Sequence, residues 1–348
     1  MRVAYLQGAP SGHMDACLTA LVAEQGASLF LTVPRGHPNA PYAETCVAAD
    51  VRFPLTGFAP SRDLEEALLD FAPDVTLVVS WHFRAYRRCL RRLSGGLRVL
   101  CMDNQWLATL KQRVGVAIAP LYVQPLYDKV FLPGDRQRDF AHRLGFADDQ
   151  VLSGFCSADT SLFTPSRPIT ASDRRRFVFV GRLVAEKGID TLLEAYRRYR
   201  ASVDDPWELM VVGTGPLRAH CDRTEGVRSL GFVQPEDLPA TLNQARFLVL
   251  PSRFEPWGVV VHEATSMGLG VICSDRVGAA DHRLEPGSDW VIPVDRADLL
   301  AAAMQRADSL EERQLEAVAV ENLQRSKSYS PSLWAQTVVR MAEEWVAN

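Results

Sequence analysis

The sequence has few of the features that mark disulfide-bonded, zinc-binding, membrane-spanning or nucleic-acid-binding proteins. Its seven cysteines are scattered without a C-x-x-C pair, which favours reduced thiols and a cytoplasmic protein. No His, Asp or Glu cluster has metal-ligand spacing, so we expect no metal. No apolar run reaches about 18 residues, and the N-terminus is typical of a first strand rather than a signal peptide. A net charge of −4 gives no case for nucleic-acid binding.

Several catalytic motifs are also missing from the sequence. There is no G-x-S-x-G nucleophile turn and no G-x-x-x-x-G-K-[ST] phosphate loop. The glycine pair Gly213–Gly215 follows an expected strand, but the third glycine and the acidic residue of a dinucleotide fingerprint are absent. These glycines allow close backbone approach, either to a ligand or in a tight strand-to-helix turn.

The length and the order of the expected elements predict two α/β domains. The 348 residues are too many for one ordinary core. Apolar strands alternate with helices twice, which predicts two doubly wound, Rossmann-like sheets. In the first half we expect strands at 2–7, 29–33, 75–79, 98–102 and 129–132, and helices at 14–25, 62–71, 84–93 and 136–144. In the second half we expect strands at 177–180, 208–212, 228–231, 247–250 and 290–293, and a helix at 189–200.

The domain limits follow from this alternation. We expect a first domain at 1–160, a linker at 161–176, a second domain at 177–328 and a C-terminal helix at 329–348. Ligands of open α/β sheets bind beyond the C-terminal ends of the strands. This rule places Gly8–Gly12, Trp81–His82 and Asp103–Asn104 on one rim, and a cleft between the two domains is the default active site.

The stretch from Pro251 to Asp275 carries the strongest functional signal. Glu255 precedes an expected helix, and Glu263 lies about two turns inside it. The first turn of a helix binds anions through its free N–H groups, and a carboxylate can accept hydrogen bonds from a diol. A site that can bind both a phosphate and a diol indicates that the ligand is a nucleotide. The β-branched run Val259–Val261 favours a strand by propensity, but Gly258 and Gly268 bound a segment of helical length.

Two basic residues, Arg182 and Lys187, follow a strand and precede a helix, where they could converge on phosphate oxygens. The alternative is a solvated basic turn. Phe232 follows another strand and either stacks on a base or belongs to the core. In the first half, His82 and Asp103 at neighbouring strand ends are candidates to orient or deprotonate a hydroxyl, and His13 in the glycine-rich loop and Asn104 are further candidates. A structural role remains the alternative for each.

A basic stripe falls at helical spacing on one face of the helix expected at 84–93. Such a stripe can contact an anionic membrane surface or an acidic acceptor. A solvated helix face is the alternative, and it is favoured. The stripe consists of Arg84, Arg87, Arg88, Arg91 and Arg92.

The second half resembles the donor domain of retaining GT-B glycosyltransferases, in the large E-x(7)-E family (glycosyltransferase family 4-like, glycosyl transferases group 1). The resemblance covers about 177 to 306. Its motifs, in order, are Gly181-Arg182-Leu183, Glu186-Lys187-Gly188, Val212–Pro216, Leu230–Val233, Leu250–Ser252, Glu255–Gly258, Glu263-Ala264, Met267-Gly268 and Val271–Ser274. The family includes sucrose synthases and bacterial mannosyl- and glucosyltransferases.

The resemblance assigns roles to these positions. It implies that Arg182 and Lys187 hold the donor diphosphate, that Glu255 lies near the donor sugar and that Glu263 binds the ribose hydroxyls. Backbone amides from Trp257 to Val259 would bind sugar hydroxyls, and basic residues with a helix dipole would replace a metal cation. The remaining expected donor-binding residues are Gly12, Gly215, Phe232, Val233 and Gly258.

The first half resembles the family less closely. Many members carry a histidine after the fifth strand, where this chain has Asp103, and Trp257 replaces the commoner Phe. We therefore expect Asp103 on the acceptor side, with His13, His82 and Asn104 as further candidates. The C-terminal helix from about Pro331 resembles the family's return onto the first domain.

Together these observations predict a cytoplasmic enzyme of polysaccharide biosynthesis. It would move a hexose from a UDP- or GDP-sugar to a hydroxyl of a glycan, lipid or small molecule, with retention of anomeric configuration and without a metal or other cofactor. Glu255, Lys187, Arg182 and Asp103 are the catalytic candidates. The alternatives are a nucleotide-sugar epimerase of the same fold, a non-catalytic sugar-nucleotide- or glycan-binding subunit, and a scaffold that contacts the inner membrane face through Arg84–Arg92.

Overall fold

The computed structural model describes residues 1–9, 11–34, 47–166, 174–280 and 290–347. The chain forms two compact units: Met1–Ser157 with Tyr329–Asn348, and Ala158–Ser328. The linker expected at 161–176 includes residues 167–173, which lie outside the described part of the chain.

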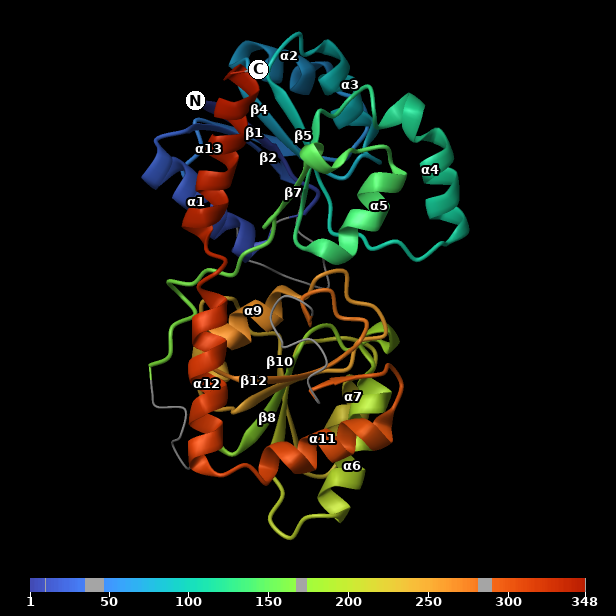
Figure 1. The fold of residues 1–348 in the computed structure, drawn as a ribbon, viewed down its shortest axis with the longest axis vertical. Helices are drawn as coiled ribbons and strands as arrows, with labels where there is room; N and C mark the ends of the chain where they lie inside the picture. The colour runs from blue at the N-terminus through green and yellow to red at the C-terminus, as the bar shows by residue number, and fades with distance from the viewer. Residues whose placement is uncertain (10, 35–46, 167–173, 281–289, 348) are drawn as a thin grey trace. The chain divides into compact units, whose positions relative to one another are not determined.

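The first unit is built on a seven-stranded parallel sheet with strand order β3-β2-β1-β4-β5-β6-β7. Its central strands are nearly continuous apolar runs because helices cover both faces of a parallel sheet (Figure 1). The chain leaves β1 in one direction and returns on its other side at β4, which creates a switch point between them. The strands are β1 (Arg2–Leu6), β2 (Ser28–Pro34), β3 (Val51–Leu55), β4 (Val75–Val79), β5 (Leu97–Cys101), β6 (Lys129–Leu132) and β7 (Val151–Ser153).

The helices of the first unit follow the predicted order, with one addition. The four predicted helices correspond to α1, α2, α3 and α5, the last preceded by a 3-10 turn, whereas α4 was not expected. A capping box between Thr109 and Gln112 begins α4, and Pro120 lies inside it. The helices are α1 (Gly12–Gln25), α2 (Arg62–Phe71), α3 (Arg84–Arg92), α4 (Leu110–Tyr122) and α5 (Arg138–Arg143).

Two strands of the first sheet were also missed, and both lie at its edges. Pro54 within β3 argued against a strand, but an edge strand tolerates a residue that has no N–H to donate. The other, β7, has only three residues and carries little pattern of its own.

The second unit contains a six-stranded parallel sheet with order β10-β9-β8-β11-β12-β13. Each strand expected there is present within one residue at either end. The strands are β8 (Arg176–Val180), β9 (Glu208–Val212), β10 (Val227–Gly231), β11 (Phe247–Leu250), β12 (Gly270–Ser274) and β13 (Val291–Ile292). The helices are α6 (Ile189–Ala201), α7 (Arg218–Asp222), α8 (Leu238–Leu242), α9 (Val259–Ser266), α11 (Ala297–Asp308) and α12 (Glu312–Ser326).

The last helix, α13 (Pro331–Ala347), packs on α1 of the first unit, as expected (Figure 1). Ser332 Oγ donates a hydrogen bond to Glu24 Oε1 at 2.8 Å. Trp334 is fully buried, with its ring 6.3 Å from that of Phe131. The two parallel sheets and this returning helix confirm the predicted fold class.

Candidate active site

The stretch from Pro251 to Asp275 forms a strand end, a turn, a helix and a second strand, in that order. The run Val259–Val261 is helical despite its β propensity. Gly258 precedes the helix with φ 91°, a conformation that disfavours other residues, and a Cβ there would lie 3.0 Å from Glu255 Cγ. The free N–H groups of the first turn of α9 therefore lie immediately after Glu255 in the chain.

Lys187 and Glu255, 68 residues apart in sequence, form an ion pair between Nζ and Oε2. Both side chains are largely buried, with 11% and 14% of their surfaces exposed. The buried hydroxyl of Ser252 lies 3.4 Å from the same carboxylate oxygen. The structure thus brings together two of the predicted site residues in a place where charges are poorly screened by water.

Arg253 fixes the loop that carries Lys187, and sequence reasoning missed it. Its backbone N–H donates to Glu186 O at 2.8 Å, and its guanidinium donates to Ala185 O at 2.6 Å. The guanidinium also pairs with Asp190, whose pKa this hydrogen bond lowers, and with Asp295. An arginine directly after the β11 turn was the available signal, but its partners are distant in sequence.

Glycine is required where the loop after β8 meets the loop after β9. Gly213 has φ 133°, and a Cβ there would lie 1.9 Å from Gly181 O. A Cβ at Gly215 would lie 2.5 Å from Leu183 O. Leu183 N–H in turn donates to Thr214 O at 2.8 Å. At this point the glycines serve backbone packing between two loops, and a role of Gly215 in donor binding stays a prediction.

Glu263 lies on α9 with a half-buried side chain. Among the described residues its carboxylate has no hydrogen-bond partner, and burial raises its pKa to about 7. A carboxylate without partners has its full acceptor capacity available for a ligand.

The other predicted donor residues differ in exposure and in the unit to which they belong. Arg182 is 51% exposed and lies 3.6 Å from Glu186. Phe232 and Val233 are half-buried after β10. Trp257 is buried, and Gly12 begins α1 in the other unit.

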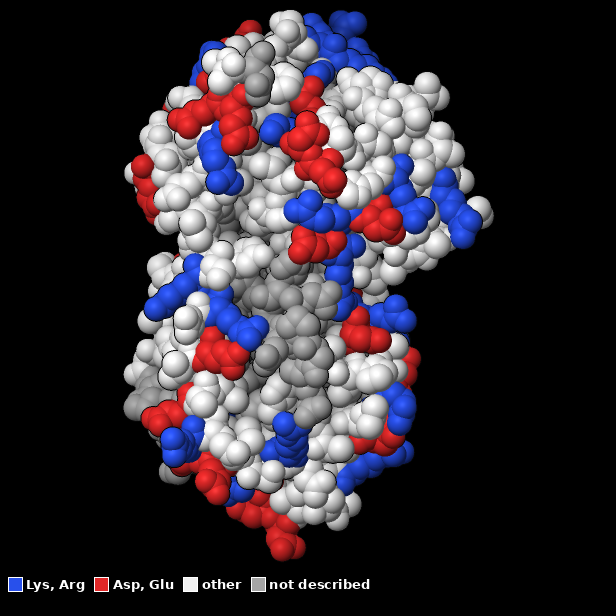
Figure 2. Space-filling model, viewed as in Figure 1, with Lys and Arg blue, Asp and Glu red and all other residues white. Residues whose placement is uncertain are grey.

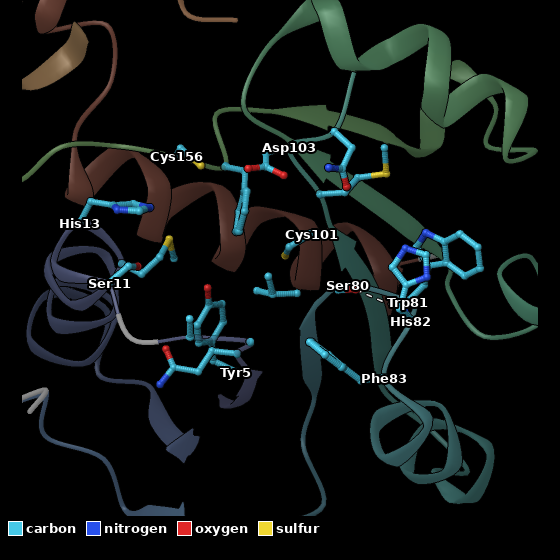
Figure 3. Close-up of a pocket in the computed structure, with 18 residues that line it drawn as sticks. Tyr5, Ser11, His13, Ser80, Trp81, His82, Phe83, Cys101, Asp103 and Cys156 are labelled. Atoms are coloured by element: carbon cyan, nitrogen blue, oxygen red, sulfur yellow. Dashed lines mark hydrogen bonds between the residues drawn. The ribbon is translucent and has the colours of Figure 1, made fainter. Parts of the chain in front are cut away.

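A cavity of about 340 Å³ lies in the first unit, at the C-terminal ends of β1, β4 and β5 (Figure 3). The predicted residues His13, His82, Asp103 and Asn104 all line it. Gly12 is not among the lining residues. Figure 3 shows His13 and Asp103 at the upper side of the cavity and Trp81 with His82 on the right. The switch point of the first sheet therefore collects the acceptor-side candidates, as the rim argument predicted.

The charge state of this cavity follows from burial. Burial lowers the pKa of His13 to about 4. Burial also lowers the pKa of His82, as do the nearby Lys111 and Arg87. Both imidazoles are therefore neutral at pH 7. Ser80, which directly follows β4 and lies two residues before His82, has φ 86°, a strained value that is often found at functional sites.

Gln7 is a cavity residue that the sequence did not reveal. Its Nε2 donates to Thr32 O at 2.8 Å, which fixes the amide and leaves Oε1 as a buried acceptor that has no partner within the described part of the chain. A buried polar atom without a partner is costly unless a ligand or water satisfies it. No motif marked Gln7, because only the neighbouring strand fixes the direction of its amide.

The arginine stripe of α3 is only partly free to meet a partner. Arg88 and Arg92 form ion pairs with the buried carboxylate of Glu65, at 2.6 and 2.9 Å. Arg87 donates to Trp81 O and lies over the Tyr122 ring.

Among the described residues, no group of three or more His, Cys, Asp or Glu side chains could hold a metal ion.

Comparison with known proteins identifies the second unit. Residues 174–308 match the family model described as glycosyl transferases group 1. Alpha-D-kanosaminyltransferase of Streptomyces kanamyceticus is 30% identical over 51% of this chain and 46% of its own length. D-inositol 3-phosphate glycosyltransferase of Jonesia denitrificans is 29% identical over 50% of this chain and 47% of its own. The chain thus spans about half the length of these curated relatives.

Solved structures match the whole chain at low identity. Sucrose-phosphate synthase from Thermosynechococcus elongatus has a TM-score of 0.72 at 20% identity, over 100% of this chain and 99% of that one. Anabaena HepE in complex with UDP-glucose has a TM-score of 0.73 at 16% identity, over 99% and 100%. These likenesses confirm the GT-B fold, and the family match over residues 174–308 confirms that the second unit resembles the glycosyl transferases group 1 family.

Proposed function

We propose that this protein is a glycosyltransferase that moves a hexose from a nucleoside diphosphate sugar to an acceptor hydroxyl with retention of configuration. The observation that carries the proposal is the arrangement around α9. Glu255 of the buried Lys187–Glu255 ion pair comes just before the start of α9 in the chain, and Glu263, without a partner among the described residues, lies within α9. This combination suits an anionic phosphate, a sugar and a diol together.

In this proposal the second unit binds the donor. Lys187 and the exposed Arg182 bind the diphosphate, together with N–H groups of the first turn of α9. Glu255 lies near the sugar and Glu263 accepts hydrogen bonds from the ribose hydroxyls. The cations stabilise negative charge as it develops on the leaving diphosphate, which is the largest electrostatic contribution that we expect.

We propose that the bond from the anomeric carbon to the phosphate oxygen breaks through an oxocarbenium-like transition state. The acceptor oxygen bonds to the anomeric carbon on the same face, and its proton goes to a leaving phosphate oxygen. Configuration is then retained without a covalent enzyme intermediate. Glu255 stabilises positive charge and holds the sugar, and it does not act as a nucleophile in this scheme.

The cavity of the first unit is the proposed acceptor site. Its described lining residues include the hydrogen-bond acceptors Gln7 Oε1 and Asp103, two neutral histidines and several aromatic rings, and no Lys or Arg. These lining residues suit a ligand that presents hydroxyl or amine donors, and they disfavour a phosphate because no cationic side chain is among them. We therefore propose that the group seated there is an uncharged or amine-bearing polyol.

A thermal-shift screen of UDP-, GDP- and ADP-sugars tests the donor half of the proposal. UDP-glucose comes first because a structural neighbour is described in complex with it. At about a hundred times the dissociation constant, the correct donor should stabilise the protein by about 2.7 kcal/mol. Absence of a shift with every donor contradicts the proposed site.

Product analysis tests the transfer itself. NMR of the product from the best donor and an acceptor panel should show the donor's anomeric configuration in a new glycosidic bond. An epimerised sugar nucleotide formed without acceptor would identify an epimerase instead. Donor binding without turnover across the panel would identify a binding subunit.

A further inference from the structure

The outer face of α4 exposes large apolar side chains to solvent. Leu110, Val114 and Leu121 on this helix are 78%, 52% and 69% exposed, and Leu107 just before it is 44% exposed. No other segment of the described chain concentrates exposed aliphatic residues in this way. A contiguous exposed apolar face on a soluble domain is typical of a surface that meets a partner or a membrane.

The helix geometry places these side chains on one line. At 100° per residue, Leu110, Val114 and Leu121 fall within about 40° of one another around the axis of α4. The opposite face contains the buried Gly115 and Ala119. A Cβ at Gly115 would lie 3.2 Å from the ring of Trp81, which lines the cavity. One face of α4 therefore packs next to the cavity wall while the other is apolar and open.

Two basic side chains flank the exposed line, one on each side. Lys111 and Arg113 are exposed, and they point about 100° and about 60° away from Leu110 in opposite senses. Arg113 also donates to Ala108 O at 3.0 Å. No Asp or Glu occurs from residue 104 to residue 127. In Figure 2 the surface over α4, at the upper right, is white with blue beside the end where the helix begins.

From this arrangement we propose that α4 docks on the surface of an anionic lipid bilayer. Its 13 residues span about 20 Å, a length that lies in the headgroup region and does not cross the bilayer. In keeping with this, no described helix of the protein has the length and apolar content of a membrane span. The aliphatic line enters the acyl boundary, and the flanking cations stay with the lipid phosphates.

Two features favour a bilayer over a protein partner. The exposed line consists of Leu and Val without an aromatic side chain, whereas cores of protein interfaces are enriched in Tyr, Trp and Phe. The complete lack of acidic residues over 104–127 matches a uniformly negative surface. The arginine face of α3 is the weaker candidate, because Arg88 and Arg92 already pair with Glu65.

Vesicle flotation of the full chain tests the proposal. Wild-type protein should float with phosphatidylcholine vesicles that contain phosphatidylglycerol, and much less with phosphatidylcholine alone. The double variant Leu110→Ser/Leu121→Ser should lose at least about tenfold in partitioning, because two apolar side chains leave the acyl boundary. The matched control Val320→Ser/Val346→Ser changes equally exposed residues on α12 and α13 and should float like wild type.

Two further measurements complete the test: the effect of the basic side chains on vesicle binding, and the oligomeric state of the protein. Lys111→Gln/Arg113→Gln should weaken binding to anionic vesicles by several fold, more than Arg84→Gln/Arg91→Gln on α3. Failure of the wild type to float, or unchanged flotation of the double leucine variant, overturns the proposal. So does a wild-type dimer that Leu110→Ser/Leu121→Ser converts to a monomer, since α4 would then be an interface between copies.

Discussion

Glu263→Gln should stabilise the unliganded protein and weaken donor binding at the same time. The wild-type side chain is half-buried without a partner among the described residues, and desolvation of its carboxyl raises the pKa from 4.5 to about 7. Glutamine has nearly the same shape and no charge to desolvate. The substitution therefore removes the cost of the buried carboxylate, together with its ability to bind hydroxyls as an anion.

The magnitude follows from the pKa shift. One pKa unit corresponds to about 1.36 kcal/mol, so a rise to about 7 lowers wild-type stability by up to about 3 kcal/mol above pH 7. Below pH 4.5 both the folded and the unfolded carboxyl are protonated and this cost vanishes. Between these values the unfolded chain ionises first, so wild-type stability falls as pH rises. The advantage of Glu263→Gln should grow from near zero at pH 4.5 to its full size at pH 8.

Chemical denaturation of both proteins across this pH range measures the effect, and titration with the best nucleotide sugar measures the affinity. Loss of a charged hydrogen-bond acceptor should weaken donor binding by about tenfold or more. Glu316→Gln, on the exposed side of α12, is the control and should change neither quantity. A stability difference that does not vary with pH would refute the reasoning, as would full donor affinity in Glu263→Gln.

Three further predictions concern the second unit. Lys187→Ala should reduce turnover by at least about tenfold, because a charge-assisted hydrogen bond contributes about 1.5–3 kcal/mol; turnover near the wild-type value, measured as nucleotide release, would count against the site. Gly213→Ala should destabilise by more than about 2 kcal/mol in urea unfolding, since its Cβ would lie 1.9 Å from Gly181 O at φ 133°, whereas Gly95→Ala, where a Cβ meets nothing within 4 Å, should be mild. Turnover should survive EDTA; a loss that Mg²⁺ or Mn²⁺ restores would show that the basic residues do not replace a cation.

Strand positions could be predicted because a buried parallel strand is apolar along most of its length. Val75–Val79 and Lys129–Leu132 are found with the predicted bounds for this reason. Helix α4 was missed because it lacks a comparable pattern of buried apolar residues. Its apolar residues face solvent and its interior contains Gly115 and Pro120, so the usual pattern of one buried stripe is absent.

In the Pro251–Asp275 stretch, local sequence features predicted the secondary structure but not the environment of the two glutamates. Its glycines and length indicated a helix against the propensity of Val259–Val261, and α9 confirms that interpretation. The roles given to Glu255 and Glu263 stay predictions. The structure adds that Glu255 pairs with Lys187 and that Glu263 has no partner among the described residues, two environments that their spacing did not reveal.

The sequence by itself determined the two α/β units, the order of their strands and helices, and the residue types that gather at the strand ends. These depend on periodicity, glycine punctuation and local charge, which neighbouring residues specify. Only the tertiary structure decided that Lys187 meets Glu255 and that Arg253 fixes the lysine loop. It also decided that Gln7 places an acceptor without a described partner in a cavity with neutral histidines. Such contacts and pKa shifts arise between segments distant in the chain, where burial and close packing set the energy.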